Sequence, residues 1–183
     1  AIVYLIYYGG GDTTAYWDGA VTLNNLFMNS PSLYFENLIT EPSSEIFSKH
    51  FSVETGYPPG WLFKEPEAWF ICKVASIVSF ITFKSYFAGT IFFAFLTAMA
   101  SWRVFELIVK LGTHKTNIAA LCILFVPSVS FWCTGISKDS LVFISILNLL
   151  YFIFNIMVLR SPIKLKHVLI ILLSIFLIYH IRS

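Results

Sequence analysis

The chain has 183 residues, of which 57% are hydrophobic and only 12% are charged, whereas about a quarter of the residues in an average soluble domain are charged. So few charges cannot cover so much apolar surface in water, which excludes an ordinary soluble domain, and the apolar content excludes a disordered chain. The net charge of +2 is too small for nucleic-acid binding by charge alone, and three cysteines within apolar runs do not make a disulfide-stapled scaffold. We therefore expect an all-α, polytopic integral membrane protein.

The chain begins and ends within apolar runs. Residues 1–8, AIVYLIYY, predict the end of a transmembrane helix, and the first residue is Ala and not Met. We therefore expect a fragment of a longer polytopic protein. Residues 9–66 are polar and rich in turn residues (GGGDTT, NSPS, TEPSS, TGYPPG), which predicts a large loop outside the membrane.

Residues 67–84 are apolar but carry a narrow polar row. Its four members recur every three positions: Lys73, Ser76, Ser79 and Thr82. They share one face of a helix, and an amphipathic helix of this kind, flanked by tryptophans, suits a position in the membrane interface. The alternative is an ordinary transmembrane span with a polar seam.

Four longer apolar runs follow, and we expect each to be a transmembrane helix: residues 85–109, 116–133, 139–159 and 165–183. The first run is about 37 Å long at about 1.5 Å per residue, which is enough to cross about 30 Å of hydrocarbon. The second run is marginal by length, and Pro127 lies within it.

The charges predict which side of the membrane each connection faces. Eight of the ten acidic residues lie within residues 9–67, whereas the short connections at 110–115 and 160–166 carry lysines and arginines. Short basic loops stay in the cytoplasm, so residues 9–66 and the turn at 137–140 are expected outside. Parity then favours the interfacial interpretation of residues 67–84, because a further span there would bring residues 9–66 and 110–115 to the same side.

The first candidate site is GGGDTTAYWD, residues 9–18, at the start of the predicted loop. Glycines let the backbone turn sharply and approach a ligand, and a carboxylate there can take a proton from an attacking hydroxyl or bind a metal ion. The carboxylates are Asp12 and Asp18, whose spacing of six places them near opposite faces of a helix. The structural alternative is that Asp12 only caps a helix that starts at Thr13.

The second candidate site is PSVSFWCTGISKDS, residues 127–140. Pro and Gly break the helix there, and polar groups gather at membrane depth, where they are costly and commonly functional. A lysine beside a helix N-terminus suits a phosphate, so we expect Ser137, Lys138 and Asp139 to hold the phosphate of a lipid substrate. The alternative is that Asp139 caps the next helix and Lys138 extends its ammonium group to the interface.

A third stretch, Tyr57-Pro58-Pro59-Gly60-Trp61, is a loop stiffened by two prolines. His50 lies upstream of it and could act as a base or a metal ligand, but a single loop histidine is more often neither.

This layout resembles membrane glycosyltransferases of the GT-C type, which use polyprenyl-phosphate sugars and include mannosyltransferases and aminoarabinose transferases. The second candidate site is similar to the family's P-x-x-x-F-W turn with its later basic and acidic pair, and the matching residues are Pro127, Phe131, Trp132, Lys138 and Asp139. The stretch Tyr57-Pro58-Pro59 is similar to the family's His-Pro-Pro, with Tyr in the place of His.

The resemblance implies a multi-pass enzyme of the bacterial inner membrane. It implies transfer of a sugar from a polyprenyl-phosphate donor to a glycan, lipid or protein acceptor on the outer face. An acidic residue of the first outer loop is catalytic in that family, which points to Asp12 and, second, to Asp18, as the general base or as a ligand of a divalent metal ion.

Two other functions stay open at this point. One is a membrane polymerase of the O-antigen or exopolysaccharide type. The other is a non-catalytic, transporter-type subunit, which predicts charged residues along a path through the spans. Within the long run 85–109 the only charges well inside are Arg103 and Glu106, both near its end and spaced to share a helix face, which weakens the transporter interpretation.

Overall fold

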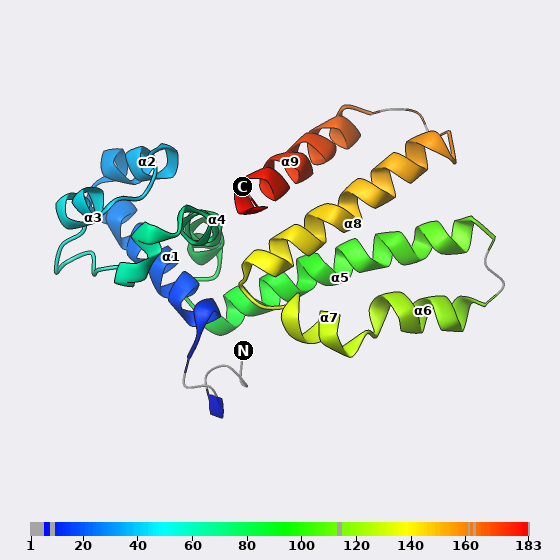
Figure 1. Cartoon of the computed structure of the whole chain (residues 1–183), viewed down its shortest axis with the longest axis horizontal. Helices are drawn as coiled ribbons and strands as arrows, with labels where there is room; N and C mark the ends of the chain where they lie inside the picture. The colour runs from blue at the N-terminus through cyan, green and yellow to red at the C-terminus, as the bar shows by residue number, and fades with distance from the viewer. Residues whose placement is uncertain (1–5, 8–9, 113–114, 161, 163, 183) are drawn as a thin grey trace. The chain divides into compact units, whose positions relative to one another are not determined.

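The computed structural model describes residues 6–7, 10–112, 115–160, 162 and 164–182. Most of the predicted membrane helix at residues 1–8 therefore lies outside the described residues. In the described part the chain is helical and has no strand, which confirms the all-α prediction. The elements are shown in Figure 1: α1 (Asp12–Asn29), α2 (Pro31–Ile39), α3 (Ser44–His50), the 3₁₀ helix η2 (Gly60–Lys64), α4 (Pro66–Ile81), α5 (Tyr86–Lys110), α6 (Thr116–Leu124), α7 (Pro127–Trp132), α8 (Lys138–Met157) and α9 (Leu165–Arg182).

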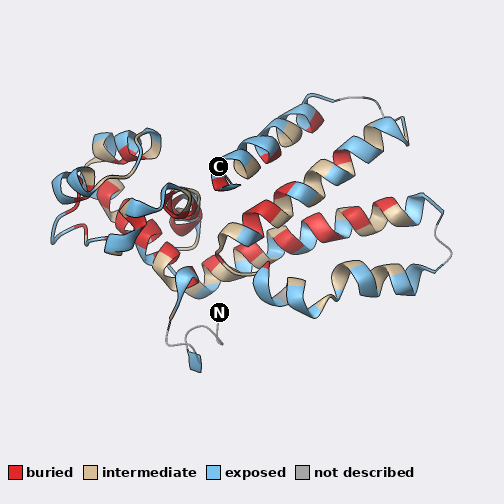
Figure 2. Ribbon diagram, in the orientation of Figure 1, coloured by how far each residue is buried: buried red, intermediate tan, exposed pale blue. Residues whose placement is uncertain are grey.

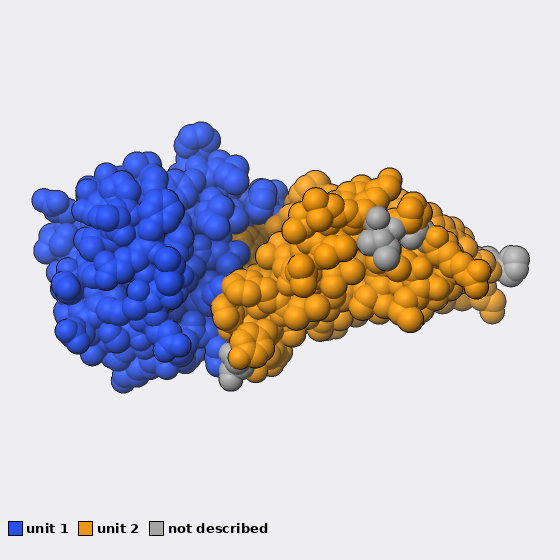
Figure 3. Space-filling view, turned by 90° about the horizontal axis from the view of Figure 1, so that it is seen from above, with its two compact units in different colours: residues 1–92, 136–138 blue, residues 93–135, 139–183 orange. Residues whose placement is uncertain are grey.

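The chain divides into two compact units, coloured blue and orange in Figure 3. Unit 1 comprises residues 1–92 and 136–138, and unit 2 comprises residues 93–135 and 139–183. Helix α5 contributes its first turns to unit 1 and the rest to unit 2.

Unit 1 is built around the packing of α1 on α4. The segment expected to be a large loop thus contains three α-helices and a 3₁₀ helix. Gly19 lets the two helices approach closely, since a Cβ at this position would lie 2.8 Å from Sγ of Cys72. The core is largely apolar and aromatic, and its fully or nearly fully buried side chains include Tyr16, Trp17, Leu23, Leu26, Leu62, Trp69 and Ile71.

The polar row of α4 lies against α1 and α2. Asn24 of α1 donates a hydrogen bond of 2.9 Å to Oγ of Ser79, and the hydroxyls of Tyr34 of α2 and Ser76 are 3.0 Å apart. These hydroxyls are buried, and a buried polar group without a partner is costly. The side of α4 that faces away from unit 1 is consequently apolar.

Lys73 belongs to the same polar row and caps the end of α2. Its Nζ donates to the carbonyl oxygens of Leu38 at 3.2 Å and Thr40 at 2.9 Å, where helical carbonyls have no partner within the helix. Burial lowers the pKa of Lys73, and the nearby charge of Glu41 opposes this effect. The polar row therefore fastens three helices of unit 1 together.

Among the described residues, three helices are long and apolar enough to cross a membrane: α5, α8 and α9. The most apolar stretches of α5, α8 and α9 are 33%, 28% and 17% buried, so the larger part of each stretch is half-buried or exposed (Figure 2). In unit 2 the buried polar residues include Thr97, whose hydroxyl donates to the carbonyl of Cys133 at 2.6 Å. Exposed apolar side chains and a buried hydroxyl with a hydrogen-bond partner suit a helix bundle in lipid.

Five of the described basic residues of unit 2 lie at one end of it, whereas Arg182 is the last residue of α9. Figure 1 shows the last turns of α5 and α8 and the first turns of α6 and α9 at the same end of this unit. These turns and their described flanks carry five cations: Lys110, Lys115, Arg160, Lys164 and Lys166. The described ends of the two predicted basic connections thus lie at the same end of unit 2.

The run 116–133 differs from the predicted single span. It forms the two short helices α6 and α7, and Pro127 is the first residue of α7. The residue before a proline is pushed out of the helical conformation, and Val126 has φ −74° and ψ 114°. The apolar stretch Thr116–Val129 is too short to cross by itself, at about 21 Å if fully helical.

Candidate functional site

The glycine-rich stretch forms the N-terminus of α1. Gly10 and Gly11 have φ of 118° and 149°, which glycine adopts without a Cβ penalty. Helix α1 starts at Asp12 itself, and Thr14 provides the cap, because its Oγ1 accepts from N–H of Gly11 at 3.0 Å and donates to the carbonyl of Gly11 at 2.8 Å. Asp12 is exposed in the first turn, where the helix dipole favours a negative charge.

Asp18 lies on the same helix, about 120° around the axis from Asp12 at 100° per residue. The two carboxylates therefore do not form a pair. Partial burial raises the pKa of Asp18 while its side chain keeps contact with solvent. A carboxylate with a raised pKa is a stronger base, which is the property that general-base catalysis needs.

The environment of Asp18 also includes the α1–α4 contact. Burial raises the pKa of the Cys72 thiol, and the charge of Asp18 adds to that effect. Two residues before Asp18, the ring of Tyr16 lies 6.0 Å from that of Trp61 of η2, with the ring planes tilted by 58°. Asp18 thus projects from a helix that is fixed on both sides by packed side chains.

Lys138 is held by two glutamates of unit 1. Its Nζ lies 3.3 Å from Oε2 of Glu65 and 3.4 Å from Oε2 of Glu67. Glu65 is the N-cap residue of α4 and Glu67 lies in its first turn. The ammonium group expected to meet a phosphate is therefore already balanced by two carboxylates, which sequence reasoning missed because they are about 70 residues away along the chain.

The neighbours of Lys138 have separate environments. Asp139 lies in the first turn of α8, and its Oδ1 is 3.5 Å from Nη2 of Arg182 in an exposed pair that contributes little stability. The hydroxyl of Ser140 donates to the carbonyl of Gly135 at 2.6 Å, which closes the turn before α8. Ser137 is half-buried. The structure thus joins Lys138 to α4 and Asp139 to α9.

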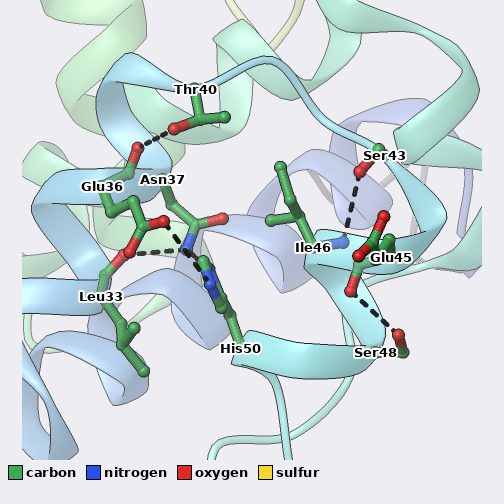
Figure 4. Close-up of polar contacts among 9 residues, drawn as sticks. All are labelled: Leu33, Glu36, Asn37, Thr40, Ser43, Glu45, Ile46, Ser48 and His50. Atoms are coloured by element: carbon green, nitrogen blue, oxygen red, sulfur yellow. Dashed lines mark hydrogen bonds and ion pairs between the residues drawn. The ribbon is translucent and has the colours of Figure 1, made fainter.

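His50 is a structural residue in this fold (Figure 4). It is buried at the end of α3, and Nδ2 of Asn37 donates both to the carbonyl of Leu33 at 2.8 Å and to Nδ1 of His50 at 2.9 Å. The carbonyl of Leu33 fixes the amide orientation, so Nδ1 accepts and the ring proton lies on Nε2, 3.9 Å from Oε1 of Glu36. This contact fastens α3 to α2 and accounts for His50 without a catalytic role.

The charges within α5 also have local partners. Arg103 donates to Oδ1 of Asn148 at 2.8 Å and lies over the ring of Phe152, whereas Glu106 accepts from Nε1 of Trp102 at 2.9 Å. Sequence spacing allowed an Arg103–Glu106 pair, but the structure gives each residue another partner. His167, which sequence reasoning did not single out as a site, is buried against the ring of Phe152.

Over the described ranges, no group of three or more His, Cys, Asp or Glu side chains is placed to hold a metal ion. The divalent ion expected with Asp12 and Asp18 therefore has no set of ligands assigned to it.

The comparisons with known proteins add no relative: no family model, no curated protein and no solved structure matches the chain.

Proposed function

We propose that this chain belongs to a polytopic glycosyltransferase of the bacterial inner membrane, which moves a sugar from a polyprenyl-phosphate donor to an acceptor on the outer face. In this proposal α5, α8 and α9 cross the bilayer, α4 lies in the outer interface, and the other helices of unit 1 form the outer head. The observation that carries the chemistry is Asp18, a solvent-accessible carboxylate with a raised pKa in that head.

The proposed reaction is a single displacement at the anomeric carbon. The acceptor oxygen forms a bond to that carbon while the bond from the carbon to the lipid-phosphate oxygen breaks. The acceptor proton passes to an aspartate carboxylate, and the electron pair of the broken bond leaves with the polyprenyl phosphate. The resemblance assigns this carboxylate to Asp12, whereas the partial burial that raises the pKa of Asp18 favours Asp18.

The donor phosphate needs a cation at the membrane face, and in this proposal Lys138 supplies it. Because Lys138 is held by Glu65 and Glu67, the phosphate exchanges with these carboxylates as the donor enters. Ser137 and the N–H groups at the start of α8, beside Asp139, are the further donors for the phosphate oxygens.

Substitution of each aspartate tests the proposal. In membranes that contain the full-length protein, we measure transfer of radiolabelled hexose or pentose from a panel of polyprenyl-phosphate sugars. Replacing the general base by Asn is expected to lower transfer about 100-fold or more. If Asp18 is the base, Asp18→Asn has this effect, and the wild-type rate falls with decreasing pH from a higher pH than an ordinary carboxyl gives, because only the deprotonated form accepts the proton.

The matched control is Glu45→Gln, which removes an exposed carboxylate from α3 in the same unit and is expected to leave transfer unchanged. Immunoblotting of the membranes verifies equal protein levels. Full transfer activity in both Asp12→Asn and Asp18→Asn would exclude the two aspartates, and with them the proposed mechanism.

A further inference from the structure

The turn between α4 and α5 holds a large apolar side chain away from the fold. Phe83 is 91% exposed, the highest exposed fraction among the large hydrophobic residues described. Phe83 and Lys84 have φ of 51° and 61°, a left-handed conformation that is unfavourable for residues other than glycine. Such a conformation persists only where the surrounding structure determines it.

The surrounding structure does determine it, since four hydrogen bonds fix this turn. The backbone N–H of Lys84 donates to the carbonyl of Ser79, and that of Ser85 to the carbonyl of Thr82, each at 3.0 Å. The Lys84 side chain donates to Oδ1 of Asn25 at 2.7 Å, and Nε1 of Trp17 donates to the carbonyl of Lys84 at 3.4 Å. Phe83 is therefore exposed because a rigid turn presents it.

Exposed apolar side chains also lie on both helices that flank Phe83. We define the apolar face of unit 1 by its exposed members: Ile77, Ile81, Phe83, Phe87 and Ile91. Along α5 the same row continues at steps of four residues through Phe95 and Met99, which are also exposed. One stripe thus runs from the turn into a helix that is long and apolar enough to cross a membrane.

The length of the uncharged segment places the turn at the hydrocarbon boundary. Between Lys84 and Arg103 the chain carries no charged side chain, and these 18 residues span about 27 Å as a helix. A hydrocarbon core of about 30 Å that ends near Arg103 therefore begins at the turn. The long stem of Lys84 is directed to Asn25 of α1, so its charge is kept with the polar side of unit 1.

We propose that the apolar face of unit 1 is a lipid-binding surface and that Phe83 inserts among the acyl chains of the adjacent leaflet. Lipid on the outward side then accounts for the exposed apolar side chains Ile77 and Ile81 of α4, while the polar row pairs inside unit 1. This inference depends on the membrane placement of α5 within the proposed function and not on sugar transfer.

Depth measurement with spin labels tests the surface. The native cysteines of the full-length protein are replaced, Phe83→Cys carries a nitroxide, and the protein is reconstituted in phosphatidylethanolamine–phosphatidylglycerol vesicles. We expect the label to collide more with oxygen, which concentrates in hydrocarbon, than with a water-soluble nickel chelate. Ile81→Cys makes the same test where the Phe83 variant fails to fold. The control is Val53→Cys, 87% exposed on the same unit, which is expected to collide more with the nickel chelate.

Three other results overturn the inference. A label at residue 83 that favours the nickel chelate shows that the turn lies in water. Protection from both agents shows that protein covers the face, either a partner or a second copy of the chain. Preference for oxygen at both residues 83 and 53 shows that lipid contact is not specific to this face. Lipid contact at residue 83 in a protein without transferase activity would support the surface while contradicting the proposed function.

Discussion

Gly89 is a position where the absence of a side chain decides the packing of unit 1. A Cβ on this residue of α5 would lie 2.5 Å from Cη2 and 2.6 Å from Cζ3 of Trp17, a buried ring that also donates a hydrogen bond to the turn before α5. Such distances are far inside van der Waals contact, so an added methyl group forces the indole or the helix to move.

Gly89→Ala is therefore expected to lower the free energy of unfolding by about 1–3 kcal/mol, as overpacking of a core does. The measurement is denaturant-induced unfolding of the full-length protein in mixed micelles. Gly60→Ala is the matched control, since no atom lies within 4 Å of its added Cβ, and a change within about 0.5 kcal/mol is expected. Equal stability of the two variants would show that Trp17 does not pack on Gly89.

The sequence predicted some properties of individual residues and not others. The spacing of Asp12 and Asp18 correctly places them on separate sides of one helix, because helical geometry is local. The partners of Lys138 were not predictable from spacing, since Glu65 and Glu67 meet it only through the tertiary fold. The raised pKa of Asp18 likewise arises from burial, which a single sequence does not reveal.

At the scale of elements, the contact of α1 with α4 determines how the polar row is used. The three-residue spacing predicted that the row shares a face and suggested that this face meets the membrane interface, whereas in the structure it meets α1 and α2. Asn24 and Tyr34 supply polar partners from α1 and α2, so the row lies inside unit 1. The run 116–133 shows a second difference between prediction and structure. Its overall hydropathy suggested one continuous span, but the chain breaks before Pro127, which is the first residue of α7.

The Asn24–Ser79 contact provides a stability prediction for this element pair. Oδ1 of Asn24 is buried and has no hydrogen-bond partner among the described residues, and Ser79→Ala removes the partner of Nδ2 as well. We expect this variant to lose about 1–3 kcal/mol of unfolding free energy, the cost of a buried unsatisfied group. The double variant Asn24→Leu with Ser79→Ala removes both polar groups and is expected to be more stable than Ser79→Ala alone.

A double-mutant cycle in mixed micelles measures this coupling. The comparison is Tyr34→Phe, which removes the hydroxyl that contacts Ser76 in the same polar row of α4. This variant is expected to show no coupling to Asn24→Leu. Strictly additive effects of Asn24→Leu and Ser79→Ala would contradict the direct contact.

At the scale of the whole molecule, composition correctly predicted an all-helical chain with helices long and apolar enough to cross a membrane. Three helices of the described structure have the length and apolarity of membrane spans. In unit 2 the buried positions include Ser101, Ser145 and Ser174, whereas large apolar side chains are exposed along the same helices. The internal structure of residues 10–66 was not anticipated, because short helices separated by turn residues give only weak periodic signals.

The two units have opposite charge at their aqueous surfaces. Unit 1 contains most of the acidic residues, whereas basic residues gather at the α5–α6 and α8–α9 end of unit 2. This asymmetry predicts that unit 1 lies outside and the basic end of unit 2 inside the cytoplasm. The proposed reaction and the proposed lipid contact both require that placement.

Labelling of single cysteines from each side of the membrane tests this placement most directly. Val53→Cys in unit 1 and Lys164→Cys at the basic end of unit 2 are introduced separately into the full-length protein without its native cysteines, and both positions are exposed. We predict that a membrane-impermeant maleimide labels residue 53 in intact spheroplasts and labels residue 164 only after permeabilisation. Labelling of both residues from the same side would contradict an outer head on a membrane-spanning bundle.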